Sequence, residues 1–170
     1  MNISIPVENG YLPDKYGKYS SEKYRLHGDN IYSFPLSISD VPKNTQSLAL
    51  VFIDYDSTPV CGFTWIHWLA CNIDPCTTYI PENASRENRS LFIQGTNSLY
   101  SRKEEVGDDI IGLHSYVGPC PLDKDHRYTV KLYALDTMLD LNEGYFLNDF
   151  HWAIKNHVLE TASLDLWSKA

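Results

Sequence analysis

Two aspartates and a histidine lie beside the most apolar part of this sequence. Residues 48–53 are all apolar and lead into Asp54 and Asp56, and after a turn at Gly62 a second apolar run contains His67. A short apolar run between turn residues is typical of a strand buried on both faces. Charged groups at the end of such a strand need a partner or a function, because burying an unpaired charge costs free energy. These side chains are therefore the first candidates for acid–base chemistry or ligand binding.

The alternation of side chains along a strand assigns these residues to faces. In the second apolar run, residues 63–72, it places Trp65, His67 and Leu69 on one face and Trp68 on the other. Aromatic walls with a few polar groups are typical of a pocket for a small ligand. The alternative is structural: His67 is a core residue whose ring bonds a backbone carbonyl, and the aspartates only cap a turn. The pattern alone leaves both interpretations open.

A second polar group follows much later in the chain. A strand is expected at residues 127–135, and its alternation places His126 and Tyr128 on one face and Arg127 on the other. On that other face we expect Arg127 to pair with an acidic residue. The preceding stretch, residues 116–121, is Tyr-Val-Gly-Pro-Cys-Pro and is expected to be stiff and turn-forming, because proline fixes its own backbone angle.

Short apolar runs separated by turn residues predict a mainly β chain. Strands are expected at residues 3–5, 31–38, 48–54, 63–72, 90–94, 127–135 and 159–167. One helix is expected near the C-terminus, capped by Asn148 or Asp149, with Phe150, Ile154 and Val158 on one face. Many short strands with one late helix favour an antiparallel β sandwich or barrel.

Residues 74–115 form a long irregular excursion, marked by prolines, asparagines and a Gly-Asp-Asp sequence. Segments of this length without regular structure are usually functional or mobile.

The composition indicates a globular chain and argues against nucleic acid as a partner. The 170 residues carry a net charge of −8, with 43% hydrophobic residues and no cluster of lysine or arginine. Nucleic acids and anionic membranes require a basic surface. The first residues lack the pattern of a signal peptide, and no apolar stretch approaches the roughly 20 residues that span a bilayer. We therefore expect one domain over residues 1–170, located in the cytoplasm, with no integral membrane segment.

The four cysteines are expected to be reduced, because cytoplasmic proteins rarely keep disulfides. Their spacing also lacks the Cys-x-x-Cys pairs of a zinc site. We expect them to fill small apolar spaces. They are Cys61, Cys71, Cys76 and Cys120.

Four motifs, in this order, resemble the phosphatidylethanolamine-binding protein family, above all its bacterial Raf-kinase-inhibitor-like branch. They are Asp-Tyr-Asp-Ser-Thr-Pro at residues 54–59, Trp-Ile-His-Trp at 65–68, Tyr-Val-Gly-Pro-Cys-Pro at 116–121 and His-Arg-Tyr at 126–128. The likeness extends from the early residues through the C-terminal region and is weakest at residues 82–112.

The first motif departs from the family pattern in two ways. Tyr55 replaces the usual first proline, and one extra residue separates Asp56 from Pro59. The turn is therefore expected to be less stiff than is usual in the family. Neither change removes a polar group, so we expect the site to keep its chemistry.

The resemblance implies a two-sheet antiparallel β sandwich with a C-terminal helix and a small anion pocket at one end. It implies no cofactor, no metal and no catalytic residue. The residues of this chain that match the pocket of the family are Asp54, Asp56, Trp65, His67, Tyr116, Gly118, Pro119, His126 and Tyr128. Gly118 and Pro119 would bring backbone groups close to the ligand, where a side chain at 118 is unwelcome.

The function implied is that of a non-enzymatic protein that holds an oxyanion or a phosphorylated head group. An oxyanion needs hydrogen-bond donors, which two imidazoles supply. Ionised Asp54 and Asp56 can only accept hydrogen bonds, so they would orient the histidines and raise the imidazole pKa, or bind an amine of the ligand.

Two other functions stay open. The chain could bind and inhibit a partner kinase or protease, as some relatives in this family do. It could also be a hydrolase in which His67 or His126 acts as the base, although no HExxH or GxSxG motif is present. Bacterial relatives often form homodimers, and Trp167 could lie in such an interface or cover its own core.

Overall fold

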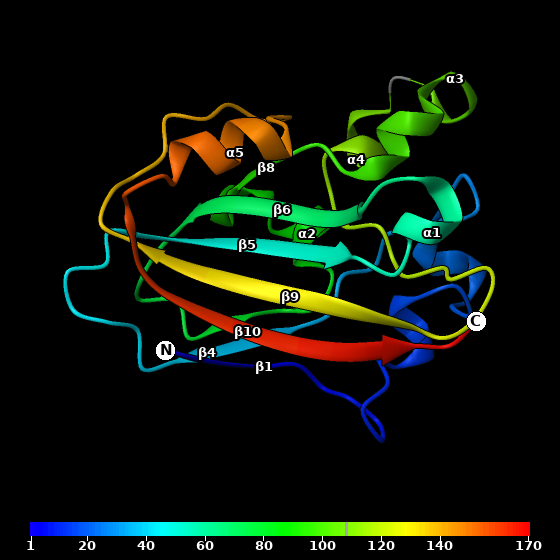
Figure 1. Cartoon of the computed structure of the whole chain (residues 1–170), viewed down its shortest axis with the longest axis horizontal. Helices are drawn as coiled ribbons and strands as arrows, with labels where there is room; N and C mark the ends of the chain where they lie inside the picture. The colour runs from blue at the N-terminus through cyan, green and yellow to red at the C-terminus, as the bar shows by residue number, and fades with distance from the viewer. Residues whose placement is uncertain (108) are drawn as a thin grey trace.

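A five-stranded antiparallel sheet forms the centre of the structure, with a smaller sheet on one face and a helix on the other (Figure 1). The computed structural model describes residues 1–107 and 109–170, except for the side chains at positions 106 and 110. The large sheet has the order β10-β9-β5-β6-β8 and the small sheet the order β1-β4-β7. The expected mainly β fold with two antiparallel sheets is confirmed.

The strands of the large sheet are β5 (Ser47–Asp54), β6 (Trp65–Ile73), β8 (Ile93–Gln94), β9 (His126–Leu135) and β10 (Val158–Ser168). Those of the small sheet are β1 (Asn2–Ser4), β4 (Leu36–Ser39) and β7 (Tyr79–Ile80), and a separate ribbon pairs β2 (Arg25–Leu26) with β3 (Asp29–Asn30). The α-helices are α1 (Thr58–Cys61), α2 (Ala84–Glu87), α3 (Lys103–Val106), α4 (Ile110–Leu113) and α5 (Leu147–Ala153). Short 3-10 turns are η1 (Asp14–Tyr16), η2 (Glu22–Tyr24), η3 (Arg89–Leu91) and η4 (Ser98–Arg102).

Strand β5 is buried along its whole length because it lies between β6 and β9 and both of its faces are covered. Its side chains alternate between two cores. One set packs between the two sheets, and the other packs under α5. The first set is Leu48, Leu50 and Phe52, and the second is Ala49, Val51 and Ile53.

Strand β6 contains a β-bulge next to the end of β5. Phe52 of β5 pairs with Trp68 of β6, but the next β5 residue, Ile53, pairs with Ile66. An advance of one residue along β5 therefore corresponds to two residues along β6. Such an extra residue breaks the regular alternation of side chains between the two faces.

The bulge reverses the alternation that the sequence predicts for this strand. Trp68 packs in the core between the sheets, whereas Leu69 packs under α5. The His67 ring lies 5.2 Å from the Phe52 ring, centroid to centroid, and 6.5 Å from the Trp65 ring. The prediction that His67 lies beside Trp65 is confirmed. The prediction that it shares a face with Leu69 is wrong, because the bulge turns the imidazole towards the core between the sheets.

The expected C-terminal helix is present as α5, but it is shorter and begins earlier. Its N-cap is Phe146, whose N–H donates to the Asp149 carboxylate at 2.9 Å, so neither Asn148 nor Asp149 is the cap residue. Asn156 takes a left-handed backbone conformation (φ 69°) after the helix, and Val158 opens β10 instead of extending the helix. The chain therefore ends in a strand. No helix in the described ranges is long and apolar enough to span a bilayer.

The four cysteines are free thiols, but only Cys71 is a buried apolar filler. The prediction that all four fill apolar spaces is wrong for Cys61, Cys76 and Cys120, which are exposed. These three lie in helix α1 and in loops, where the chain is not covered by a second layer.

Two side chains on β9 and β10, Arg127 and Trp167, carry expectations from the sequence. Arg127 lies on the outer side of β9, with its Nε 3.9 Å from the Asp165 carboxylate on β10, so the expected acidic partner is confirmed. The Trp167 ring lies 6.5 Å from the Tyr11 ring and is 39% exposed. Trp167 thus covers part of its own chain, and the homodimer stays a prediction.

The packing of aromatic rings between the two sheets predicts the effect of a substitution at Phe52. Phe52 is fully buried among the rings of Phe34, Tyr116 and Tyr128. We expect Phe52→Ala to lower the free energy of unfolding by about 3–5 kcal/mol, because the substitution leaves a cavity. The matched substitution Phe63→Ala, at a ring that is 39% exposed, should cost much less. Urea unfolding of both variants checks this, and equal losses would contradict the packing.

Candidate functional site

The antiparallel register brings the two polar groups of the sequence to one end of the large sheet. Asp54, the last residue of β5, pairs with Trp65 at the start of β6 and with Tyr128 near the start of β9. His126 is the first residue of β9 and lies at the same end. Segments that are far apart in the sequence therefore meet where β5 ends (Figure 1).

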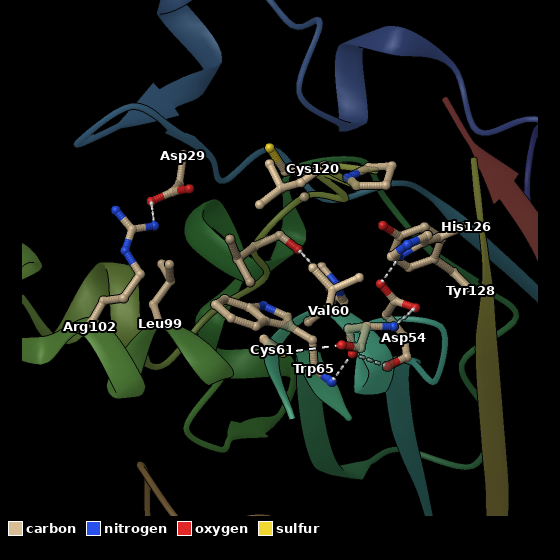
Figure 2. A pocket seen from close by; sticks show the side chains of 16 residues that line it. Asp29, Asp54, Val60, Cys61, Trp65, Leu99, Arg102, Cys120, His126 and Tyr128 are labelled. Atoms are coloured by element: carbon tan, nitrogen blue, oxygen red, sulfur yellow. Dashed lines mark hydrogen bonds and ion pairs between the residues drawn. The ribbon is translucent and has the colours of Figure 1, made fainter. Parts of the chain in front are cut away.

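A cavity of about 340 Å³ opens at this end of the sheet. In Figure 2, His126, Tyr128 and Asp54 lie at one end of it, and Arg102 with Asp29 lies at the other. The residues that line the cavity are Asp29, Asp54, Ser57, Val60, Cys61, Trp65, His67, Leu99, Arg102, Val117, Gly118, Cys120, Pro121, Leu122, His126 and Tyr128.

Six of the nine predicted site residues line this cavity. They are Asp54, Trp65, His67, Gly118, His126 and Tyr128. The other three lie behind or beside it. Asp56 accepts a hydrogen bond from the backbone N–H of Arg127 at 3.0 Å, which fixes the start of β9. Tyr116 is fully buried and donates its hydroxyl proton to the carbonyl oxygen of Tyr16 at 2.6 Å, and Pro119 is buried.

Asp54 is a buried carboxylate whose two oxygens are both engaged. Its side chain is 4% exposed. Oδ1 accepts from the backbone N–H of Ser57 at 3.1 Å, and Oδ2 lies 2.7 Å from Nδ1 of His126. Burial is the largest cause that raises the pKa of the Tyr128 hydroxyl, and the negative charge of Asp54 adds to it. Tyr128 therefore stays protonated beside this carboxylate.

Ser57 holds the turn that contains Tyr55, between β5 and β6. The Ser57 hydroxyl accepts from the N–H of Trp65 at 2.9 Å, and its proton is shared between the carbonyl oxygens of Asp54 (2.7 Å) and Phe63 (2.9 Å). The hydroxyl thereby joins the end of β5 to the start of β6. These hydrogen bonds hold the two strand ends together across the turn, while the Tyr55 side chain remains 47% exposed.

His126 lies between two carboxylates. Its Nδ1 is 2.7 Å from Asp54, and its Nε2 is 2.8 Å from Oδ1 of Asp123. Ionised carboxylates only accept hydrogen bonds, so this geometry favours a proton on both ring nitrogens, which is the imidazolium form. Burial lowers the pKa of His126, but the hydrogen bonds to the two aspartates outweigh it and the net shift is upward. This imidazole matches the expectation that an aspartate orients it and raises its pKa.

His67 has the opposite character. Its Nδ1 lies 2.8 Å from the carbonyl oxygen of Val117, which can only accept, so the proton of the neutral ring is on Nδ1. Burial lowers the pKa of His67 to about 4, although the contact with Val117 raises it in part. At neutral pH the ring therefore presents Nε2 as an acceptor. The expectation that the aspartates raise the pKa of both histidines is wrong for His67, because burial outweighs the charge of Asp54 there. Donation from His67 to an oxyanion stays a prediction.

Arg102 and Asp29 form the far end of the cavity and were not among the predicted residues. The guanidinium of Arg102 lies 3.7 Å from the Asp29 carboxylate, and its Nε donates to Glu105 at 3.0 Å. Arg102 belongs to the irregular excursion between residues 74 and 115. The length of that excursion is the only sequence signal that pointed to a functional segment, because nothing in the local pattern relates Arg102 to β5 or β9.

Gly118 is required by packing against the N-terminal segment. A Cβ atom at this position would lie 2.6 Å from the carbonyl oxygen of Tyr16 and 2.8 Å from Cβ and Oδ1 of Asn30. The Gly118 N–H also donates to the carbonyl oxygen of Asn30 at 2.8 Å. The close approach of the two protein segments is by itself enough to exclude a side chain at position 118. The expected close approach of a ligand to this backbone stays a prediction.

This packing predicts the effect of a methyl group at position 118. We expect Gly118→Ala to lower the free energy of unfolding by about 1–3 kcal/mol, because the neighbouring backbone must move. Gly112→Ala is the matched control, since its Cβ would meet only Cδ2 of Leu26 at 3.8 Å. Urea unfolding compares the free energies of unfolding of the two variants. Equal values would show that Tyr16 and Asn30 can move to accept a methyl group at position 118.

The buried neutral state of His67 predicts a dependence of stability on pH. Below the ordinary histidine pKa of about 6.5, the unfolded chain takes up a proton that folded His67 does not bind until about pH 4. Folding therefore becomes less favourable as the pH falls through this window, by about 2–3 kcal/mol from this residue.

The variant His67→Gln removes this titration and keeps a donor for Val117. We expect the free energy of unfolding to fall less between pH 7 and pH 4.5 in this variant than in the wild type, as measured with urea at both pH values. His126 shifts the other way in both proteins, so its contribution cancels in the comparison. The same fall in both proteins would contradict a neutral His67.

The whole sequence matches proteins of one family. The family model named phosphatidylethanolamine-binding protein matches residues 3–167. The uncharacterised protein YxkA of Bacillus subtilis is 46% identical over 169 residues, which is 99% of both chains. A UPF0098 protein of the archaeon Methanothermobacter thermautotrophicus is 38% identical over 144 residues, covering 84% of this chain and 85% of the relative.

Two crystal structures share the fold. CT736 of Chlamydia trachomatis, a homologue of phosphatidylethanolamine-binding proteins, has a TM-score of 0.77 at 29% identity and covers 99% of this chain and 97% of its own. YbcL of Escherichia coli has the same TM-score at 22% identity, over 99% and 98% of the two chains. The chain therefore belongs to the phosphatidylethanolamine-binding protein family.

Proposed function

We propose that this protein binds a small ligand with an oxyanion, such as a phosphorylated head group, in the cavity at the end of β5. The observation that carries the proposal is the buried His126 ring at the cavity wall, which has Asp54 on Nδ1 and Asp123 on Nε2, an arrangement that favours the imidazolium form. Its side chain is only 3% exposed, so solvent screens its charge little. A fixed cation in such a place binds anions more strongly than a surface cation does, because the local dielectric constant is low.

The rest of the cavity fits a ligand with a phosphate at one end and a donor group elsewhere. His67 offers Nε2 as an acceptor, and Asp29 adds a carboxylate, so a hydroxyl or ammonium group of the ligand has partners. Trp65 and Leu99 supply apolar walls for a short carbon chain. The name of the matching family model, which refers to a phosphorylated amine lipid, is consistent with this class of ligand.

Binding without chemistry is the function that the lining residues favour. The Ser57 proton is shared between two carbonyl oxygens, and the Cys61 thiol donates to two carbonyl oxygens at 3.3 Å. The pKa of the Cys120 thiol is raised because it is partly desolvated at the cavity wall, although the residue as a whole is exposed. Among the described residues that line the cavity, none of these groups is hydrogen-bonded to an imidazole that could activate it as a nucleophile.

The test is the binding of phosphorylethanolamine, followed by isothermal titration calorimetry at pH 6.5. We expect saturable binding to the wild type and at least about tenfold weaker binding to His126→Gln, because a charge-assisted hydrogen bond is lost. His157→Gln is the matched control, since His157 is also paired with an aspartate (Asp136, 2.8 Å) but lies outside the cavity. Absence of saturable binding to the wild type, or equal affinity of the two variants, would contradict the proposal.

A further inference from the structure

We propose that Asp123 is a built-in competitor for the ligand: its carboxylate occupies the place on Nε2 of His126 that the oxyanion takes when it binds. The inference rests on the proposed function and concerns the selectivity of the same cavity. It assigns a specificity-determining role to a residue outside the motifs of the sequence. Asp123 is not itself among the residues that line the cavity, but its partner His126 and the preceding Leu122 are, which places its carboxylate at the edge of the cavity.

The two carboxylates on His126 differ in how firmly they are held. Asp54 is 4% exposed, lies at the end of a buried strand and accepts a second hydrogen bond from the N–H of Ser57. The Asp123 side chain is 48% exposed and lies in the loop that precedes β9. One partner of the imidazolium is therefore part of the core, whereas the other can turn into solvent.

The ring of His126 has no proton left for a ligand while Asp123 is in place. Nδ1 is committed to Asp54 and Nε2 to Asp123, at 2.7 and 2.8 Å. The other titratable side chains that face this ring are His67, which is neutral, and Tyr128, whose ring centroid lies 6.3 Å away. An oxyanion that uses this imidazolium must therefore displace Asp123.

Because an anion must displace Asp123, its affinity depends on what it gains by replacing that carboxylate. A carboxylate tethered three residues from its partner competes with an effective concentration on the order of millimolar or more. A free monocarboxylate offers the same group as Asp123 and gains little by exchange. A phosphate monoester carries up to two negative charges and three acceptor oxygens, so it gains additional interactions. Asp123 should therefore exclude small carboxylates and admit phosphate groups.

The experiment compares Asp123→Ala with Asp125→Ala by calorimetry at pH 6.5, with phosphorylethanolamine and acetate as probes. Asp125 lies in the same loop, and its removal changes the net charge equally. Its carboxylate instead accepts from the Tyr11 hydroxyl at 2.8 Å and from the N–H of Ala170 at 2.9 Å. A gain in Asp123→Ala alone is therefore specific to the contact with His126.

We expect Asp123→Ala to bind phosphorylethanolamine about tenfold more tightly than the wild type and to bind acetate measurably. Asp125→Ala should behave as the wild type does. Asp123→Asn, which keeps a neutral acceptor for Nε2, should lie between them and also guards against a folding defect of the alanine variant.

The outcomes separate this inference from the proposed function. Binding of phosphorylethanolamine to the wild type, with equal or weaker binding to Asp123→Ala, would overturn the competitor role and leave the proposed function standing. Equal gains in Asp123→Ala and Asp125→Ala would also overturn it, because charge alone would then explain the effect. No binding to the wild type or to any variant would overturn both.

Discussion

The contact between Asp54 and His126 is the interaction on which the site depends. The two residues are 72 positions apart in the sequence and meet at 2.7 Å with almost no solvent around them. A buried charge without its partner is strongly destabilising, so the pair commits the end of β5 and the start of β9 to one arrangement. Ser57 completes it by donating its N–H to Asp54 and by joining β5 to β6 through its hydroxyl.

The β-bulge in β6 decides what the second histidine can do. In a regular strand that keeps Trp68 in the core between the sheets, His67 would point to the face under α5. The bulge turns it towards Phe52 and Tyr128 instead, where burial keeps it neutral. The cavity is thus lined by two unlike imidazoles: His126, whose pKa is raised by a carboxylate on each ring nitrogen, and His67, whose pKa is lowered by burial. A pair of this kind can orient a ligand that has unlike ends, which two equal imidazoles could not do.

The proposed binding of an anion is compatible with a net charge of −8, because the interactions that the proposal invokes are local. Charges at the surface are screened over about 8 Å at physiological ionic strength, whereas the buried pair at His126 is screened much less. The chain places its own carboxylates around this cation, one fixed in the core and one in a loop. The family model matches residues 3–167, and the Bacillus subtilis relative is similar over 99% of the chain, so the family likeness extends over both sheets and the site.

The sequence by itself determined the mainly β class, the central strands and six of the cavity residues, because strand alternation and short motifs are local properties. It could not determine the face of His67, since a bulge depends on pairing with a second strand. The length of α5 depended likewise on where β10 had to begin. The shift of each imidazole pKa, the contacts of Arg102 and Asp123 and the packing against Gly118 were decided only by the tertiary structure. Each depends on burial and on partners that come from distant parts of the chain.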